Sequence, residues 1–205
     1  MKLYDHSVTV SSKRLNLFLK EIGVTDIERV EVNVREGGNL AQSYQDKSVN
    51  GKVPLLELDD GTYLSETVAI SRYFDEITPN DLNLFGASTL ERAKVEMWNR
   101  IVEIDGIQNA FQAFRNLSGI YADRENCVEA WGEEAKHRVE LFLPKLDKQL
   151  GQSKYVATDN YTIADISAYI FVFVAVNALK VDVFETSQNI KRWFDDVSSR
   201  PALQN

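Results

Sequence analysis

A carboxylate and a hydroxyl stand side by side where a predicted helix begins, at the end of the stretch GKVPLLELDDGTYLSET (51–67). Glu66 and Thr67 fall in the first turn of this helix, where unpaired N–H groups and the helix dipole attract negative charge. Glu66 can therefore bind an α-ammonium group, and the helix N-terminus with Thr67 can bind the neighbouring α-carboxylate. Together they match the head group of an amino acid. The simpler interpretation is that Ser65 caps the helix and Glu66 only favours its dipole.

The same stretch contains a backbone edge that can pair with an extended peptide. Proline forces the preceding residue out of the helical region, so Val53 is extended. The Val53–Pro54 bond can adopt the cis form at a cost of about 0.5 to 1 kcal/mol. In that form the chain turns sharply into the next strand and leaves the Val53 N–H and C=O facing outward, where an extended peptide ligand can bind.

The elements that must position these residues form an α/β pattern. Within 15–24, apolar residues at helical spacing predict a helix that Gly23 stops, and three valines alternate with polar residues over 28–34, as in a half-buried strand. An Asp-Gly pair between LLEL and TYLS predicts a β-hairpin, and the segment after Glu66 has the wide apolar face of a packed helix. The predicted order over residues 1–77 is β-α-β-α-β-β-α.

The rest of the chain is predicted to be helical. Residues 78–87 contain Pro, Asn, Asp and Gly without periodicity and are interpreted as a linker, and 88–205 as an all-helical domain. The apolar run over 166–179 is shorter than the roughly 20 residues that a bilayer crossing needs, so it is interpreted as a buried central helix. Thr162 is placed to cap that helix, with Asp165 reaching back to the Thr162 backbone N–H.

Composition and charge exclude several functions. The net charge of −8, from 23 Lys and Arg against 31 Asp and Glu, repels the phosphate backbone of nucleic acids. One cysteine, Cys127, rules out a disulfide within the chain, and with two histidines no metal cluster of recognisable spacing can form. The N-terminus has no basic stretch followed by an apolar run, so no signal peptide is predicted and a cytoplasmic location is expected.

Taken in order, these motifs resemble the cytosolic glutathione S-transferases over the whole chain. The matching segments are MKLYD with a polar turn and KRL, then NGKVPLLELDDGTYLSETVAISRYF, and NYTIADISAY in the helical part. The family pairs a thioredoxin-like domain that binds glutathione with an all-helical domain that shapes a pocket for an electrophile. The resemblance therefore implies a thioredoxin-like domain over 1–77 and an all-helical domain over 88–205. It also implies a cytoplasmic homodimer that serves detoxification and uses no metal.

The resemblance further implies how glutathione binds. Val53 would pair with the cysteinyl backbone of the tripeptide, Glu66 and Thr67 would hold its γ-glutamyl end, and Lys52 would lie near the ligand. Asn39 stands where relatives often contact the glycyl end. Because the ligand and the protein are both net anionic, local positive charge is needed, and Lys52 supplies some.

The family's chemistry is the activation of a thiol. A free thiol has a pKa of about 8.5 and only the thiolate attacks, so a hydroxyl and the N-terminus of the first helix are expected to lower that pKa. The turn before this helix offers Thr9, Ser11 and Ser12. Bacterial relatives of the serine type place their serine five residues before an Arg-Val that is Arg14-Leu15 here, which favours Thr9, with Ser11 second. In the alternative interpretation these hydroxyls only cap the helix, and a water held by the helical domain assists the thiolate instead.

The sequence thus predicts a glutathione transferase that joins the thiolate of glutathione to a small, largely apolar electrophile. A second hypothesis is a non-catalytic protein of the same family that binds or regulates. Threonine in place of serine at position 9, followed by Val10, favours it. A third is a glutathione-dependent peroxidase or isomerase with the same site. The isomerase is disfavoured because the Ser-Ser-Cys pattern is absent.

Overall fold

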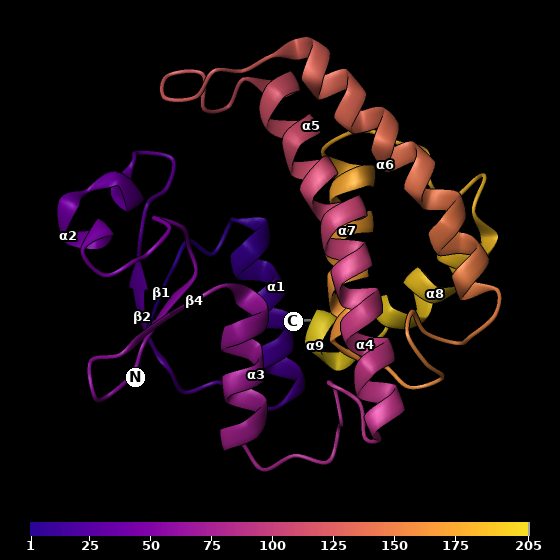
Figure 1. Ribbon diagram of the computed structural model, residues 1–205, viewed down its shortest axis with the longest axis horizontal. Coiled ribbons are helices and arrows are strands. Elements are labelled where there is room, and N and C mark those ends of the chain that lie inside the picture. The colour runs from indigo at the N-terminus through magenta and orange to yellow at the C-terminus, as the bar shows by residue number, and fades with distance from the viewer. Residues whose placement is uncertain (205) are drawn as a thin grey trace. The chain divides into compact units, whose positions relative to one another are not determined.

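The computed structural model describes residues 1–204, which divide into two compact units with the break between Leu82 and Asn83. The first unit contains a mixed sheet with helices, and the second is built from helices (Figure 1). The fold class predicted from the sequence, an α/β domain followed by an all-helical domain, is confirmed. The break lies inside 78–87, the segment predicted as the linker.

The first unit is a four-stranded sheet with helices packed against it. Its strands lie in the order β2-β1-β3-β4, with β2 parallel to β1 and the other neighbours antiparallel. The chain follows the predicted order β-α-β-α-β-β-α, with a short 3₁₀ helix added before α2. The elements are β1 (Lys2–Asp5), α1 (Val10–Glu21), β2 (Glu28–Glu31), η1 (Gly38–Leu40), α2 (Gln42–Gln45), β3 (Leu55–Glu57), β4 (Tyr63–Ser65) and α3 (Thr67–Ile77).

Both faces of this sheet are covered. Figure 1 shows α1 and α3 side by side on one side of the sheet and α2 on the other. The two longer helices bury apolar side chains that are at most 2% exposed, namely Leu15, Phe18, Leu19, Ile70 and Phe74. On the other face Tyr44 of α2 packs with a smaller buried cluster of Tyr4, Val32 and Leu55. These two apolar layers fix where the strand ends and the starts of α1 and α3 lie.

The second strand is shorter than the sequence predicts. The prediction of a strand over 28–34 is wrong at its end, because β2 stops at Glu31. Its neighbour β1 ends at Asp5, which pairs with Glu31 and whose C=O accepts the Val32 N–H at 2.8 Å. Beyond this point the Asn33 side chain accepts a backbone N–H three residues further on at 3.2 Å. This local turn directs the chain away from the sheet.

The second unit packs its helices around α7. Its elements are α4 (Thr89–Ile101), the π-helical segment η2 (Val102–Gln108), α5 (Asn109–Ser118), α6 (Glu129–Leu150), α7 (Ile163–Asn177), α8 (Gln188–Ser198) and α9 (Pro201–Gln204). Helix α7 contacts α4, η2, α5 and α8 and is buried nearly all round, so the predicted buried central helix is confirmed. Within residues 1–204, no helix combines the length and the apolar content that a membrane crossing requires.

A buried carboxylate at the start of α7 joins three segments of this unit. Asp165 accepts the Thr162 N–H at 2.9 Å, so the predicted cap is confirmed. It also accepts the Val156 N–H and the Trp193 indole N–H, each at 2.9 Å. Asp165 is 0% exposed, and burial raises its pKa to about 6 although these donors lower it.

We expect the raised pKa of Asp165 to make stability depend on pH. Because this pKa is higher in the folded protein than in the unfolded chain, its favourable contribution is complete below about pH 4 and is lost as the pH rises through about 6. Relative to Asp165→Asn, the unfolding free energy of the wild type should fall by about 2 kcal/mol between about pH 4 and pH 7. Urea denaturation of both proteins measures this difference. A difference that stays constant with pH would contradict the prediction.

Candidate functional site

The main chain before β3 presents the edge that the sequence predicts. The Val53–Pro54 peptide bond is cis. Within residues 1–204, neither the N–H nor the C=O of Val53 has a hydrogen-bond partner. The neighbouring residue is held firmly, because the Tyr44 hydroxyl donates to the Lys52 C=O at 2.7 Å and the Lys52 N–H donates to Asn50 Oδ1 at 3.2 Å. Val53 therefore offers both a donor and an acceptor to an extended ligand.

Glu66 occupies an unusual backbone conformation at the start of α3. It is the N-cap residue, with φ 70° and ψ 123°, a backbone conformation that residues other than glycine rarely adopt. Its side chain is exposed, and the carboxylate accepts a hydrogen bond from Asn50 Nδ2 at 2.8 Å. The interpretation in which Ser65 caps this helix is wrong, because Ser65 is the last residue of β4 and Glu66 takes the cap position.

Thr67 is the first residue of α3, and its hydroxyl accepts a hydrogen bond from a buried arginine. Thr67 is 8% exposed and Arg14 only 6%. Arg14 Nη1 donates to Thr67 Oγ1 at 3.2 Å. The guanidinium adds a full positive charge to the partial positive charge of the α3 N-terminus. A carboxylate bound at this helix start would therefore meet a favourable potential.

Two asparagines connect these parts of the site. Asn50 bonds both the Lys52 N–H and the Glu66 carboxylate, so it links the Val53 edge to the start of α3. Asn39, predicted near the glycyl end of the ligand, donates from Nδ2 to the Gly51 C=O at 2.8 Å. The structure thus brings Lys52, Val53, Glu66 and Thr67 together in the first unit.

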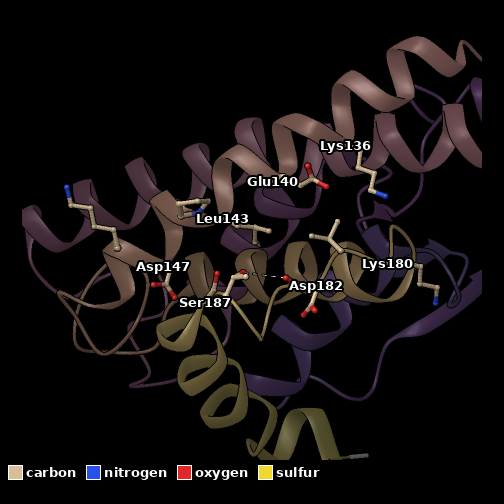
Figure 2. Close-up of a pocket in the computed structure, with 11 residues that line it drawn as sticks. Lys136, Glu140, Leu143, Asp147, Lys180, Asp182 and Ser187 are labelled. Atoms are coloured by element: carbon tan, nitrogen blue, oxygen red, sulfur yellow. Dashed lines mark hydrogen bonds between the residues drawn. The ribbon is translucent and has the colours of Figure 1, made fainter.

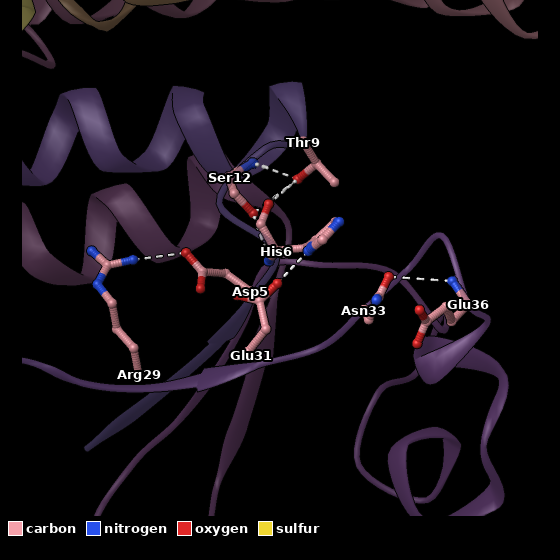
Figure 3. Close-up of polar contacts among 8 residues, drawn as sticks. All are labelled: Asp5, His6, Thr9, Ser12, Arg29, Glu31, Asn33 and Glu36. Carbon is pink, nitrogen blue, oxygen red and sulfur yellow. Dashed lines mark hydrogen bonds and ion pairs between the residues drawn. The ribbon is translucent and has the colours of Figure 1, made fainter. Parts of the chain in front are cut away.

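The hydroxyls of the turn before α1 differ in how they are used (Figure 3). Thr9 is the N-cap of α1. Its hydroxyl accepts the Ser12 N–H at 3.3 Å and donates to the His6 C=O at 2.9 Å. The hydroxyl oxygens of Thr9 and Ser12 are also within hydrogen-bond distance of each other, at 3.0 Å. Ser12 is buried. Ser11 lies in the first turn of the helix, is partly exposed, and its hydroxyl has no hydrogen-bond partner within residues 1–204. The Ser11 hydroxyl is therefore available to a ligand, whereas that of Thr9 already serves the helix cap.

In the described part of the chain no group of three or more His, Cys, Asp and Glu side chains is placed to hold a metal ion. Cys127 is a free, partly exposed thiol in the second unit.

A separate cavity of about 470 Å³ lies in the second unit, between α6 and the segment 180–187 (Figure 2). It shares no residue with the candidate site. Asp147 at its wall accepts the backbone N–H groups of Asn189 and Ile190 at 2.9 and 3.0 Å. These are donors of the first turn of α8, so Asp147 acts as the cap of that helix.

Comparison with known proteins agrees with this architecture. Two family models match, the glutathione S-transferase N-terminal domain over residues 11–77 and the C-terminal domain over 113–201. Glutathione S-transferase F13 of Arabidopsis thaliana is 30% identical, over 99% of this chain and 93% of the relative. The structure of a Gtt2-class glutathione S-transferase of Vibrio parahaemolyticus is 60% identical with a TM-score of 0.90, over 100% and 96% of the two chains. That of Gtt2 from Saccharomyces cerevisiae is 26% identical with a TM-score of 0.91, over 100% and 99%.

A small mixed-sheet domain followed by a helical domain, with a cis-proline edge beside the start of α3, is the architecture of the glutathione S-transferases. The chain belongs to the glutathione S-transferase family. The family resemblance predicted from the sequence is confirmed.

Two residues of the site are not identified by the sequence reasoning. Arg14 lies on the buried face of α1 beside Leu15 and Phe18. A charged residue at such a position signals a buried polar partner, so the helical periodicity contains the information to find it. Asn50 lies in the polar loop SVNGK (48–52), where no pattern separates it from its neighbours.

The strained conformation of Glu66 predicts an unusual order of stability for two variants. At an ordinary helix position Gly is less stable than Ala by about 0.5 to 1 kcal/mol. At φ 70° the order should reverse, and Glu66→Gly should be more stable than Glu66→Ala by about 1 kcal/mol, because only glycine adopts this region without strain. Both variants lose the same carboxylate, so chemical denaturation isolates the backbone effect. Equal stability, or a more stable alanine variant, would show that Glu66 is not strained.

Proposed function

We propose that this protein is a glutathione transferase, in which the thiolate of glutathione attacks a small, largely apolar electrophile. The observation that supports it best is the unpartnered main chain of Val53 beside the exposed carboxylate of Glu66, the two being linked through Asn50. A strand edge next to an outward acidic group suits a tripeptide whose end carries an ammonium group. Membership of the glutathione S-transferase family supports the same ligand.

Each site residue receives a role in this proposal. The Val53 N–H and C=O pair with the cysteinyl backbone of glutathione, and Glu66 binds the ammonium of the γ-glutamyl end. The N-terminus of α3, with Thr67, binds the adjacent carboxylate, and the buried Arg14 strengthens this interaction. Lys52 lies beside the edge and offsets part of the net charge of −8 that opposes an anionic ligand.

The thiol of the ligand must ionise before it attacks. Its pKa of about 8.5 is lowered by a hydrogen-bond donor and by the positive end of a helix dipole. We assign these functions to the hydroxyls of Thr9 and Ser11 and to the N-terminus of α1. Ser11 has the advantage that its hydroxyl is free, and Thr9 must give up its bond to the His6 C=O to donate to sulfur.

Assembly, domain limits and location are further parts of the proposal. A homodimer is supported by an apolar stripe along α4 and η2, where Leu90, Met97 and Ile104 recur every seven residues and are 65%, 49% and 51% exposed. A stripe of this kind is expected to be covered by another protein surface. We retain the limits 1–77 and 88–205 for the two domains, and a cytoplasmic location.

A second candidate is a non-catalytic family member that binds glutathione without turnover. The inward hydrogen bond of the Thr9 hydroxyl favours it, because that group then does not reach a ligand. A glutathione-dependent peroxidase or isomerase would use the same binding site and differ only in its second substrate.

Replacement of Glu66 tests the binding site. Glu66→Gln keeps the size of the side chain but loses the charge that attracts the ammonium group, so the Kd for glutathione should rise by roughly 10- to 100-fold, as expected for a lost charge-assisted hydrogen bond. Isothermal titration calorimetry measures this change. Glu133→Gln, an exposed acid on α6, is the matched control and should bind as the wild type does.

Two results would separate the candidates. If the wild-type protein binds no glutathione at millimolar concentration, the proposed function is wrong. If it binds glutathione but does not turn over chlorodinitrobenzene or a peroxide, and the pKa of the bound thiol equals that of free glutathione, the non-catalytic candidate is correct.

A further inference from the structure

We propose that His6, held by Glu31, is the general base that removes the thiol proton of glutathione. This inference rests on the proposed function and adds an acid–base group to it. His6 directly follows β1 in the turn that leads to α1. Its C=O accepts both the N–H and the hydroxyl of Thr9, at 2.8 and 2.9 Å (Figure 3). The imidazole therefore belongs to the same turn as the hydroxyls assigned to the thiol.

The strand pair β1–β3 ends beside the two segments that carry His6 and Val53. In the antiparallel pair of β1 and β3, Leu3 lies opposite Leu56 and Tyr4 opposite Leu55. Tyr4–Leu55 is the last pair of this ladder, and His6 and Val53 each lie two residues beyond it on their own segments. Val53 packs against the buried cluster that contains Tyr4, the residue two positions before His6. His6 and Val53 thus leave the sheet at the same end of the β1–β3 pair, where the proposed ligand edge begins.

The pairing with Glu31 determines which nitrogen of His6 can take a proton. His6 Nδ1 contacts Glu31 Oε1, and a carboxylate only accepts hydrogen bonds, so Nδ1 carries the proton. Nε2 is then left with a free lone pair, and it has no partner within residues 1–204. Figure 3 shows this second nitrogen directed away from Glu31. The His6 side chain is 15% exposed, so the ring is held in place but remains accessible.

The charges around His6 support a base at this position. On β2, Glu31 faces the ring and would stabilise the imidazolium that forms. On β1, the buried Asp5 is paired with Arg29 at 2.7 Å, so its charge is largely balanced. On the loop before β3, Lys52 directly precedes Val53.

A base adds what the hydroxyls of this turn do not provide. A serine or threonine hydroxyl donates a hydrogen bond to a thiolate but does not take up a proton near neutral pH, whereas a histidine does. In the proposed step the S–H proton moves to His6 Nε2. With chlorodinitrobenzene, the sulfur electron pair forms the C–S bond, the C–Cl bond breaks and chloride leaves. The imidazolium then passes its proton to water, which restores the neutral ring.

Three variants test this role, with three readouts each. His6→Gln removes the base, Glu31→Gln removes the charge that orients it, and His137→Gln replaces the only other histidine, whose side chain on α6 is 60% exposed. The readouts are the Kd for glutathione and the ultraviolet pH titration of the bound thiolate, with kcat/KM for chlorodinitrobenzene followed over the same pH range.

We expect His6→Gln to bind glutathione within about twofold of the wild type. At about pH 6.5, kcat/KM should fall by about 10- to 100-fold, because only about 1% of a thiol with a pKa of about 8.5 is ionised there. At about pH 9 the loss should be less than about threefold, since the thiolate then forms without a base. In the ultraviolet titration, His6→Gln should raise the pH at which the bound thiolate forms. Glu31→Gln should raise it by a smaller amount, and His137→Gln should leave it unchanged.

Other outcomes overturn the inference. If His6→Gln retains the wild-type titration and pH profile, His6 is not the base. If it loses glutathione binding in step with turnover, at every pH, its role is structural. A wild-type protein that binds no glutathione would instead refute the proposed function, and this appears in the first Kd measurement before any variant is compared.

Discussion

The side chain of Asn50 holds the start of α3 against the loop that carries Val53. Its amide donates to the Glu66 carboxylate and its carbonyl oxygen accepts the Lys52 N–H. Glu66 keeps a positive φ, which costs on the order of 1 to 3 kcal/mol and persists only where the surroundings fix it. The result of these contacts is an outward carboxylate beside a free strand edge.

Charge is the second constraint on this site. A protein with a net charge of −8 repels an anionic tripeptide, so the binding site itself must supply a local positive potential. Helices α1 and α3 lie against each other, and Arg14 of α1 reaches Thr67 at the first position of α3. The buried guanidinium thus serves the start of the neighbouring helix, where its charge is screened less than that of an exposed side chain.

Much of this arrangement is predictable from the sequence, because it depends on local chemistry. The Asp-Gly hairpin, the Val53–Pro54 step and the Thr162 cap each carry their signal within a few residues, and each appears in the structure. The end of β2 is not predictable in this way, because it depends on where β1 stops. The use of the Thr9 hydroxyl as a cap, in contact with the His6 C=O, depends on the exact turn geometry, which residue types do not determine.

Contacts between segments far apart in the sequence are the part that sequence reasoning misses. The bond from Arg14 to Thr67 joins residues 53 positions apart, and that from Asn50 to Glu66 joins residues 16 apart. Neither pair has a spacing that a helix or hairpin would reveal. The pairing of His6 with Glu31 likewise arises because β1 and β2 end side by side.

The most direct test of the central claim compares glutathione with an analogue that lacks only the γ-glutamyl ammonium group. Calorimetry of both ligands with the wild type and with Glu66→Gln gives four affinities. If Glu66 binds that ammonium, the wild type should prefer glutathione by about tenfold or more, and the variant should bind the two ligands nearly equally. The same preference in both proteins would show that the ammonium group does not lie at Glu66 and would contradict the account.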